Sequence, residues 1–159
     1  MMYLAFYGNG YGGFSNKFIR YWTSPLTYKL NGKWRATFSH VEIVFSDGMM
    51  FSASQYEGHV RLKPHSFTGK AWVRKPLSIS AKHEGIIRKN CEVLVDIGVG
   101  YDYLGVLGFV LPFVKQEKSK AFCSEVCLDM ISAYVPKLSH LDSGRSSPND
   151  IGFALGLLS

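Results

Sequence analysis

The sequence lacks most of the features that would place the chain outside the ordinary globular class. Its three cysteines are few and odd in number, which fits a reducing compartment better than a disulfide framework. No basic segment followed by an apolar run opens the chain, so no signal peptide is visible. The longest apolar stretch, 103–114, contains two glycines and a proline and is too short to span a bilayer. We therefore expect no transmembrane segment, although peripheral membrane contact stays open.

Several motifs of known chemistry are also missing. No lysine follows the glycines of 8–13 at the spacing of a phosphate-binding loop, and no Gly-x-Ser-x-Gly elbow is present. Cys123 and Cys127 lie one helical turn apart, but no second Cys or His pair completes a tetrahedral metal site. Lysines and arginines are scattered rather than clustered. We expect no metal, no other cofactor and no nucleic-acid partner.

What is present describes one folded domain over 1–159. The chain is 47% hydrophobic and 14% aromatic, which is a globular composition, and it is long enough for a core without disulfides. The net charge of +6 suits an anionic partner such as a cell wall or a membrane surface. A basic protein with no such partner fits the charge equally well.

Hydrophobic periodicity and turn residues predict an α+β domain with an antiparallel sheet. The predicted strands cover 3–7, 37–45, 49–54, 59–62 and 71–77, and the predicted helices cover 14–23, 81–97 and 121–134. A loop or hairpin is expected over 26–36, a short helix opening 101–111, a charged loop over 115–120 and a turn over 146–150.

The strand "FSHVEIVF" (38–45) carries two titratable groups on one face. Side chains alternate along a strand, so His40 and Glu42 stand side by side with Phe38 and Val44, opposite Val41 and its neighbours. A carboxylate in this position can orient an imidazole and stabilise its charged form. The alternative is a strand face that simply meets water.

The segment "FCSEVC" (122–127) places Cys123 near the start of the last predicted helix. Backbone N–H groups and the helix dipole favour a thiolate there, and Lys118 and Lys120 lie just upstream. Cys123 also lies on the apolar side of this helix and is expected to face the sheet. The alternative is an inert core cysteine, which is the interpretation adopted for Cys127.

These segments together resemble a known family. "TFSHVEIVFSDGMMFSASQYEGHVRL" resembles the histidine-bearing hairpin of NlpC-type papain-like cysteine peptidases. "VGYDYLGVLGF", "FCSEVCLDMI" and "SPNDI" resemble the later half of the circularly permuted members, the YiiX-like proteins, with lecithin:retinol acyltransferases as distant kin. The histidine precedes the cysteine, which is the permuted order. The chain is most similar to small members encoded by tailed bacteriophages.

The resemblance implies a circularly permuted papain-like fold, a small antiparallel sheet with the nucleophile helix packed on its polar face. It matches Cys123 to the nucleophile and His40 to the general base. The third polar residue of ordinary members falls at Ser52, a poor orienter of an imidazole, so we predict that Glu42 takes that role. Tyr101, with Asp102, matches a "YD" motif; Tyr101, Ser52 and Tyr7 are expected to wall the site or support an oxyanion. Glu125 is expected to cap the helix.

The implied activity is that of a cysteine hydrolase, a peptidase or amidase acting on a small peptide or cell-wall substrate. An esterase or acyltransferase directed at lipids is the first alternative, with 103–114 walling an acyl pocket. A catalytically silent host-interaction protein that keeps the fold is the second. The resemblance places the protein in the cytoplasm of a bacterial host or in a virion. The oligomeric state stays open.

Overall fold

The computed structural model describes residues 1–8, 29–30, 33–34, 38–67, 72–102 and 120–159. Its elements, in chain order, are β1 (Tyr3–Gly8), β2 (Lys29–Leu30), β3 (Lys33–Trp34), β4 (Phe38–Val44), β5 (Met49–Ser54), β6 (His59–Pro64), β7 (Trp72–Pro76), α2 (Ala81–Asp96), β8 (Gly100–Tyr101), β9 (Lys120–Ala121), α4 (Cys123–Ile131), the 3-10 turn Pro136–Leu138 and α5 (Pro148–Ala154). The predicted α+β class is confirmed.

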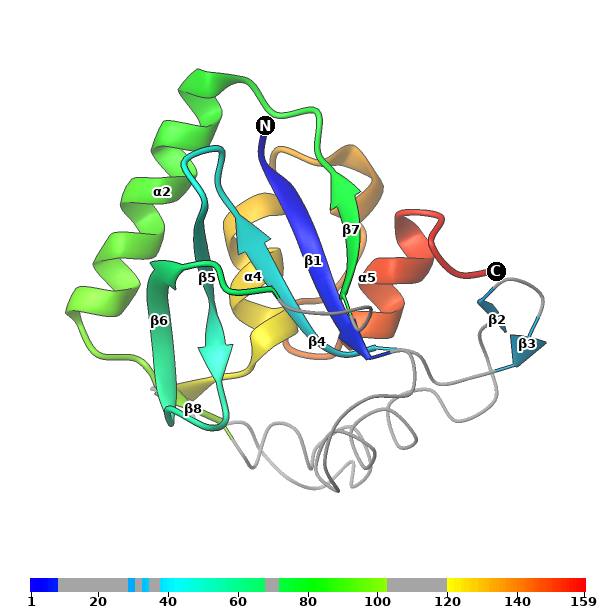
Figure 1. Cartoon of the computed structure of the whole chain (residues 1–159), viewed down its shortest axis with the longest axis horizontal. Coiled ribbons are helices and arrows are strands. Elements are labelled where there is room, and N and C mark those ends of the chain that lie inside the picture. The colour runs from blue at the N-terminus through cyan, green and yellow to red at the C-terminus, as the bar shows by residue number, and fades with distance from the viewer. Residues whose placement is uncertain (9–28, 31–32, 35–37, 68–71, 103–119) are drawn as a thin grey trace.

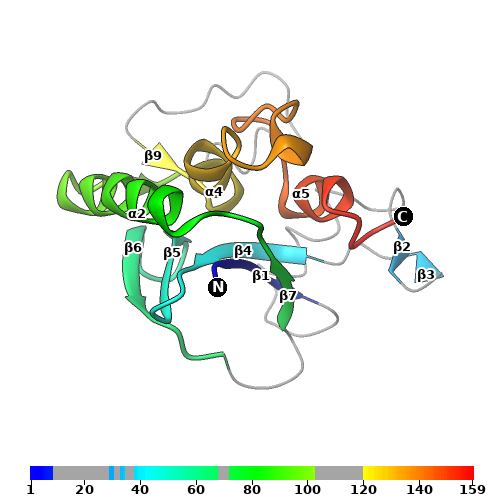
Figure 2. The same ribbon diagram turned by 90° about the horizontal axis from the view of Figure 1, so that it is seen from above.

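One seven-stranded sheet organises the domain. Its strand order is β7-β1-β4-β5-β6-β8-β9, and every pair is antiparallel except β8 with β9. The helices α2, α4 and α5 all lie on one face of this sheet (Figures 1 and 2). The predicted strands at 3–7, 37–45, 49–54, 59–62 and 71–77, and the helix at 81–97, are confirmed to within a few residues.

The main core lies between the sheet and α4. Val41, Ile43 and Phe45 of the β4 segment pack in one cluster with Val126 and Ile131 of α4. The helix therefore covers the apolar face of β4, and the prediction that it packs on the polar face is wrong. The physical reason is that α4 itself is apolar on its inner side and buries six of its nine residues.

A bulge at the start of β4 reverses one side chain. Tyr7 pairs with His40 and Gly8 pairs with Phe38, so Ser39 is the extra residue on β4. Phe38 consequently points to the helix side, where its ring lies 4.8 Å from that of Phe6. The prediction that Phe38 shares a face with His40 is wrong, because a one-residue bulge shifts the alternation before it.

β4 and β5 pair at only two positions, both next to the turn that joins them: Ile43 with Phe51 and Val44 with Met50. Towards His40 the two strands diverge, and Figure 1 shows α4 behind the point of divergence. There the carbonyl of Val41 accepts a 2.8 Å hydrogen bond from the Ser52 hydroxyl and a 3.6 Å one from the Cys127 thiol. Hydrogen bonds from side chains thus replace the backbone hydrogen bonds that are missing between β4 and β5 at this point.

Three local predictions need correction. Residue 101 belongs to the strand β8 rather than to a short helix, because it pairs with β9 beside it. The helix predicted over 121–134 covers only Cys123–Ile131, because Ala121 belongs to β9. The turn predicted over 146–150 is the start of α5, where Ser147 and Asp150 form a capping box around Pro148.

Other predictions fall outside the described residues: the helix over 14–23, the acyl-pocket segment 103–114, Lys118 and most of the charged loop over 115–120. Of the hairpin expected over 26–36, the paired strands β2 and β3 are described. Among the helices in the described part of the chain, none is both long and apolar enough to cross a membrane.

The buried hydroxyl of Ser52 should matter for stability. Ser52→Ala removes a buried hydrogen bond and leaves the Val41 carbonyl poorly satisfied, which costs about 1–3 kcal/mol. Urea denaturation should show this loss, whereas the exposed control Ser46→Ala should stay within about 0.5 kcal/mol of wild type. Equal stabilities of the two variants would mean that the hydroxyl does not hold the diverging strands.

Candidate active site

His40 and Glu42 form the close pair that strand alternation predicts. Nε2 of His40 lies 2.8 Å from Oε1 of Glu42. The Glu42 side chain is only 2% exposed, and that of His40 is 20% exposed. The contact exists because residues two apart on β4 project from the same face of the sheet. A carboxylate at this distance fixes the plane of the ring and stabilises an imidazolium.

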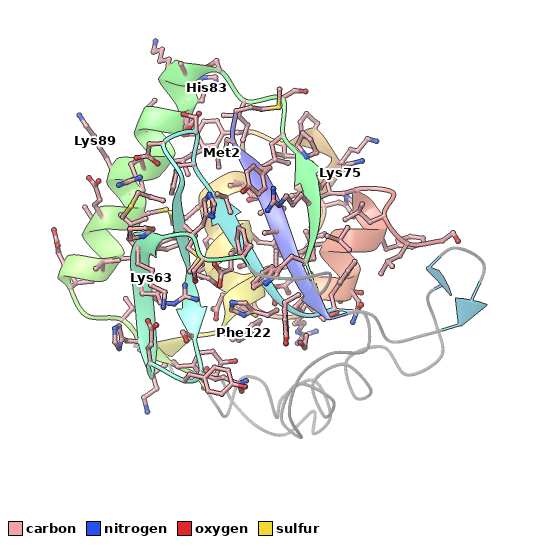
Figure 3. All side chains as sticks on the ribbon, in the orientation of Figure 1. Met2, Lys63, Lys75, His83, Lys89 and Phe122 are labelled. Carbon is pink, nitrogen blue, oxygen red and sulfur yellow. The ribbon has the colours of Figure 1, made fainter. Side chains whose placement is uncertain are left out.

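Cys123 is the first residue of α4 and lies close enough to His40 to interact with its ring. Its thiol interacts electrostatically with the His40 imidazole, and this interaction helps to raise the pKa of His40. Since Nε2 is taken by Glu42, the nitrogen left for the thiol is Nδ1. Figure 3 shows the preceding residue, Phe122, at the end of the sheet where β4 begins. Its N–H donates to Glu125 Oε2 at 3.2 Å, so the predicted capping role of Glu125 is confirmed.

A residue that sequence reasoning missed, Arg61 of β6, completes the charge cluster. Its Nη2 lies 2.6 Å from Oε1 of Glu42, the same oxygen that His40 contacts. Its Nε lies 3.1 Å from Oε2 of Glu57. Arg61 is the last residue of the "GHVR" motif that forms part of the family resemblance. This motif was the feature of the sequence that could have indicated Arg61 as a site residue. The contact to Glu42 joins residues 19 apart in the chain and leaves no local pattern.

The cluster strongly perturbs both partners. Burial opposes the charge of His40, but Cys123 and Glu42 outweigh it and raise the pKa of His40 from 6.5 to about 9. Burial likewise opposes ionisation of Glu42, but His40 and Arg61 lower the pKa of Glu42 from 4.5 to about 2. Near neutral pH, His40 is therefore a cation and Glu42 an anion.

The other two cysteines have a different environment. Cys91 and Cys127 are fully buried. Burial raises the pKa of each thiol well above its usual range. The prediction that Cys127 belongs to the core is confirmed, because it packs in the main core cluster.

Asn149 of α5 holds the strand that carries His40. This fully buried side chain accepts a 2.9 Å hydrogen bond from the N–H of Phe38 and donates a 3.1 Å bond to its carbonyl. Both bonds fall just before the bulged Ser39, where pairing between β1 and β4 is interrupted. Asn149 lies in the "SPNDI" segment, and α5 places it there.

A cavity of about 210 Å³ opens beside the imidazole. The described residues that line it are polar or aromatic: Tyr7, Ser39, His40, Glu42, Ser54, Gln55, Tyr56, Arg61, Trp72 and Tyr101. The Trp72 ring packs 5.1 Å from that of Tyr7 and edge-on to His40. Cys123 is 4% exposed and is not among these described lining residues.

The remaining predicted site residues divide into two groups. Tyr101 and Tyr7 line the cavity, as expected of wall residues. Ser52 does not line it, because its hydroxyl points to the Val41 carbonyl inside the core. Asp102 is buried next to Tyr101. Among the described residues, no group of three or more His, Cys, Asp or Glu side chains is placed to hold a metal ion.

Comparison with known proteins adds no relative. No protein-family model, no curated protein and no solved structure matches this chain. The site must therefore be interpreted from its own geometry. That geometry is a thiol at a helix N-terminus, an imidazole that interacts with the thiol, and a carboxylate hydrogen-bonded to the imidazole.

Cys123 should be the most reactive of the three thiols. It contacts an imidazole that carries a positive charge, whereas Cys91 and Cys127 are buried and resist ionisation. Limiting iodoacetamide near pH 7, followed by peptide mass spectrometry, should label Cys123 first. Earlier labelling of Cys91 or Cys127 would remove Cys123 as the nucleophile.

The two perturbed groups also predict how stability depends on pH. The raised pKa of His40 contributes stability that is complete below about 6.5 and is lost as the pH rises through about 9. The lowered pKa of Glu42 contributes stability that is present above about 4.5 and is lost as the pH falls towards 2. The denaturation midpoint should therefore be highest between about pH 4.5 and pH 6.5, and it should decrease at lower and at higher pH.

Glu42→Gln supplies the control for this pH dependence. The variant cannot ionise at position 42, so its deficit relative to wild type should be greatest between about pH 4.5 and 6.5 and should shrink on either side. A deficit that is constant from pH 3 to pH 10 would show that the carboxylate is not ionised in the folded protein.

Proposed function

We propose that the protein is a cysteine hydrolase that cleaves amide bonds through Cys123, His40 and Glu42. The observation that carries the proposal is the position of the imidazole, which interacts with the Cys123 thiol and is hydrogen-bonded to the buried carboxylate of Glu42. This is the relation of nucleophile, base and orienting group that activates weak nucleophiles. The order of His40 before Cys123 supports a permuted papain-like ancestry.

In the proposed reaction, Cys123 and His40 start as an ion pair, in which the His40 imidazolium already holds the proton of the thiol. The thiolate attacks the substrate carbonyl carbon and forms a tetrahedral adduct. The first N–H groups of α4, at Cys123 and Ser124, have no carbonyl partner within the helix and are suited to stabilise the oxyanion. Because Cys123 is 4% exposed, substrate binding has to displace neighbours of the thiol.

Collapse of the adduct breaks the carbon–nitrogen bond, and the imidazolium of His40 gives its proton to the leaving amine. The neutral imidazole then takes a proton from water, whose oxygen attacks the thioester. Breakdown of this second adduct breaks the carbon–sulfur bond, releases the acid and restores the thiolate and the imidazolium. Glu42 stays ionised throughout and supports the cation at each step.

The cavity supports a compact acyl group, because aromatic rings and polar side chains share its wall. None of the described lining residues is aliphatic, so a fatty acyl chain would find no matching wall among them. The volume of about 210 Å³ is below the range of about 300–1,000 Å³ typical of sites for drug-sized ligands. Both features favour an amide or peptide substrate over a lipid ester.

Substitution of the three residues tests the proposal. A mixed panel of peptide amides, cell-wall fragments and lipid esters should give amide hydrolysis with wild type and none with Cys123→Ala or His40→Ala, by mass spectrometry of the products. Glu42→Gln keeps a hydrogen bond but loses charge support. Its turnover should fall by one to several orders of magnitude; the matching change in a serine-protease triad costs about ten-thousandfold.

Ser52→Ala is the matched control, because Ser52 is buried on the adjacent strand but contacts neither His40 nor the cavity. Its turnover, per folded molecule, should stay well above that of Glu42→Gln. Equal turnover of wild type and Cys123→Ala would exclude the thiol mechanism. Hydrolysis of lipid esters alone would move the substrate class to acyl esters.

A further inference from the structure

One oxygen of Glu42 serves two cations. Oε1 accepts from His40 at 2.8 Å and from Arg61 at 2.6 Å, whereas the buried Oε2 has no partner in the described part of the chain. A carboxylate can give each cation an oxygen of its own, and here it does not. The guanidinium and the imidazole therefore share one oxygen, which brings their two positive charges close together.

Arg61 is held in place from its outer side as well. Glu57, in the turn before β6, contacts Arg61 through Oε2 and Lys63 through Oε1. The charges alternate in sign from His40 through Glu42, Arg61 and Glu57 to Lys63, which Figure 3 shows on β6. The Arg61 side chain is only 11% exposed, so solvent screens this contact little.

The imidazolium and the guanidinium are like charges bonded to one atom. Their contacting nitrogens lie 2.8 Å and 2.6 Å from that oxygen, and at such short range a like charge disfavours the charged form of its neighbour. Arg61 is always protonated, so this effect does not vary over the working range of pH. Its presence weakens the hold of Glu42 on the imidazolium proton.

We propose that Arg61 is a positioning residue that fixes the Glu42 carboxylate and limits its attraction for the His40 imidazolium, so that His40 can release its proton to the leaving amine. This inference rests on the proposed amidase function for its last step only. In the described part of the chain, the other titratable groups around His40 are the Cys123 thiol and the phenols that line the cavity, from Tyr7, Tyr56 and Tyr101.

The direct test is the titration of the His40 ring by nitrogen NMR, which needs no activity. Arg61→Gln should raise the pKa of His40 by about one unit, because a like charge is removed. Arg61→Lys keeps the charge and should stay close to wild type. A lower pKa of His40 in Arg61→Gln would mean that Arg61 serves only to keep Glu42 ionised. An unchanged pKa of His40 would mean that Arg61 has a structural role only. Either result overturns the proposal.

Glu57→Gln provides a second test of the same charge relation if the Arg61→Gln variant does not fold. Glu57 is one-third exposed and lies in a turn, so its replacement removes an anion from the chain at small structural cost. The pKa of His40 should then move downward by a few tenths of a unit, opposite to the effect of Arg61→Gln. A rise in Glu57→Gln would contradict the proposed charge relation.

Measurements of amide and ester turnover distinguish the role inferred for Arg61 from the proposed amidase function. A p-nitrophenyl ester needs no proton on its leaving group, whereas an amide does. Arg61→Gln should lower the ratio of amide to ester turnover, by up to about tenfold for a one-unit rise in the pKa of His40. Wild-type inactivity on both substrates would overturn the amidase proposal but leave the NMR result standing. An unchanged ratio in an active variant would overturn the role of Arg61 in proton release.

Discussion

The buried carboxylate of Glu42 is the constraint on which the rest of the site depends. It sits in β4 between two core residues, Val41 and Ile43, and is almost completely removed from water. An ion in this position costs several kcal/mol unless opposite charges replace its hydration. His40 supplies one cation from the same strand and Arg61 supplies the other from β6. Because β5 lies between β4 and β6, the guanidinium reaches across a strand and ties the two parts of the sheet together.

The divergence of β4 from β5 explains how α4 meets a side chain from the other face of the sheet. Where backbone pairing continues, the sheet separates its two faces, and a helix on one side cannot contact a residue on the other. From Ile43 towards His40 the backbone pairing of β4 with β5 stops, and the Ser52 hydroxyl and the Cys127 thiol bond to the Val41 carbonyl instead. The first turn of α4 reaches His40 at this place, so an irregularity of the sheet creates the thiol–imidazole contact.

Local patterns predicted the parts of the site that are local. The alternation of β4 was sufficient to place His40 beside Glu42, and the turn and apolar pattern placed Cys123 near the start of a helix. Phe38 was assigned to the wrong face because a one-residue bulge leaves no mark in an alternating sequence. Arg61 was missed because a contact between β4 and β6 depends on strand order, which alternation does not encode. The start of α5 was taken for a turn because Ser-Pro-Asn-Asp suits both.

The energetics of the cluster favour a functional interpretation over a structural one. Replacing a buried ion pair with apolar side chains is often neutral or stabilising, so a fold gains little from keeping such a pair. Here several buried charges meet beside a cavity, and two of them have strongly perturbed pKa values, a combination that concentrates at functional sites. A purely structural network would serve as well anywhere in the core. The network around Glu42 instead reaches the Cys123 thiol at the N-terminus of α4. There the His40 cation can stabilise a thiolate, and its proton can be passed to a leaving group.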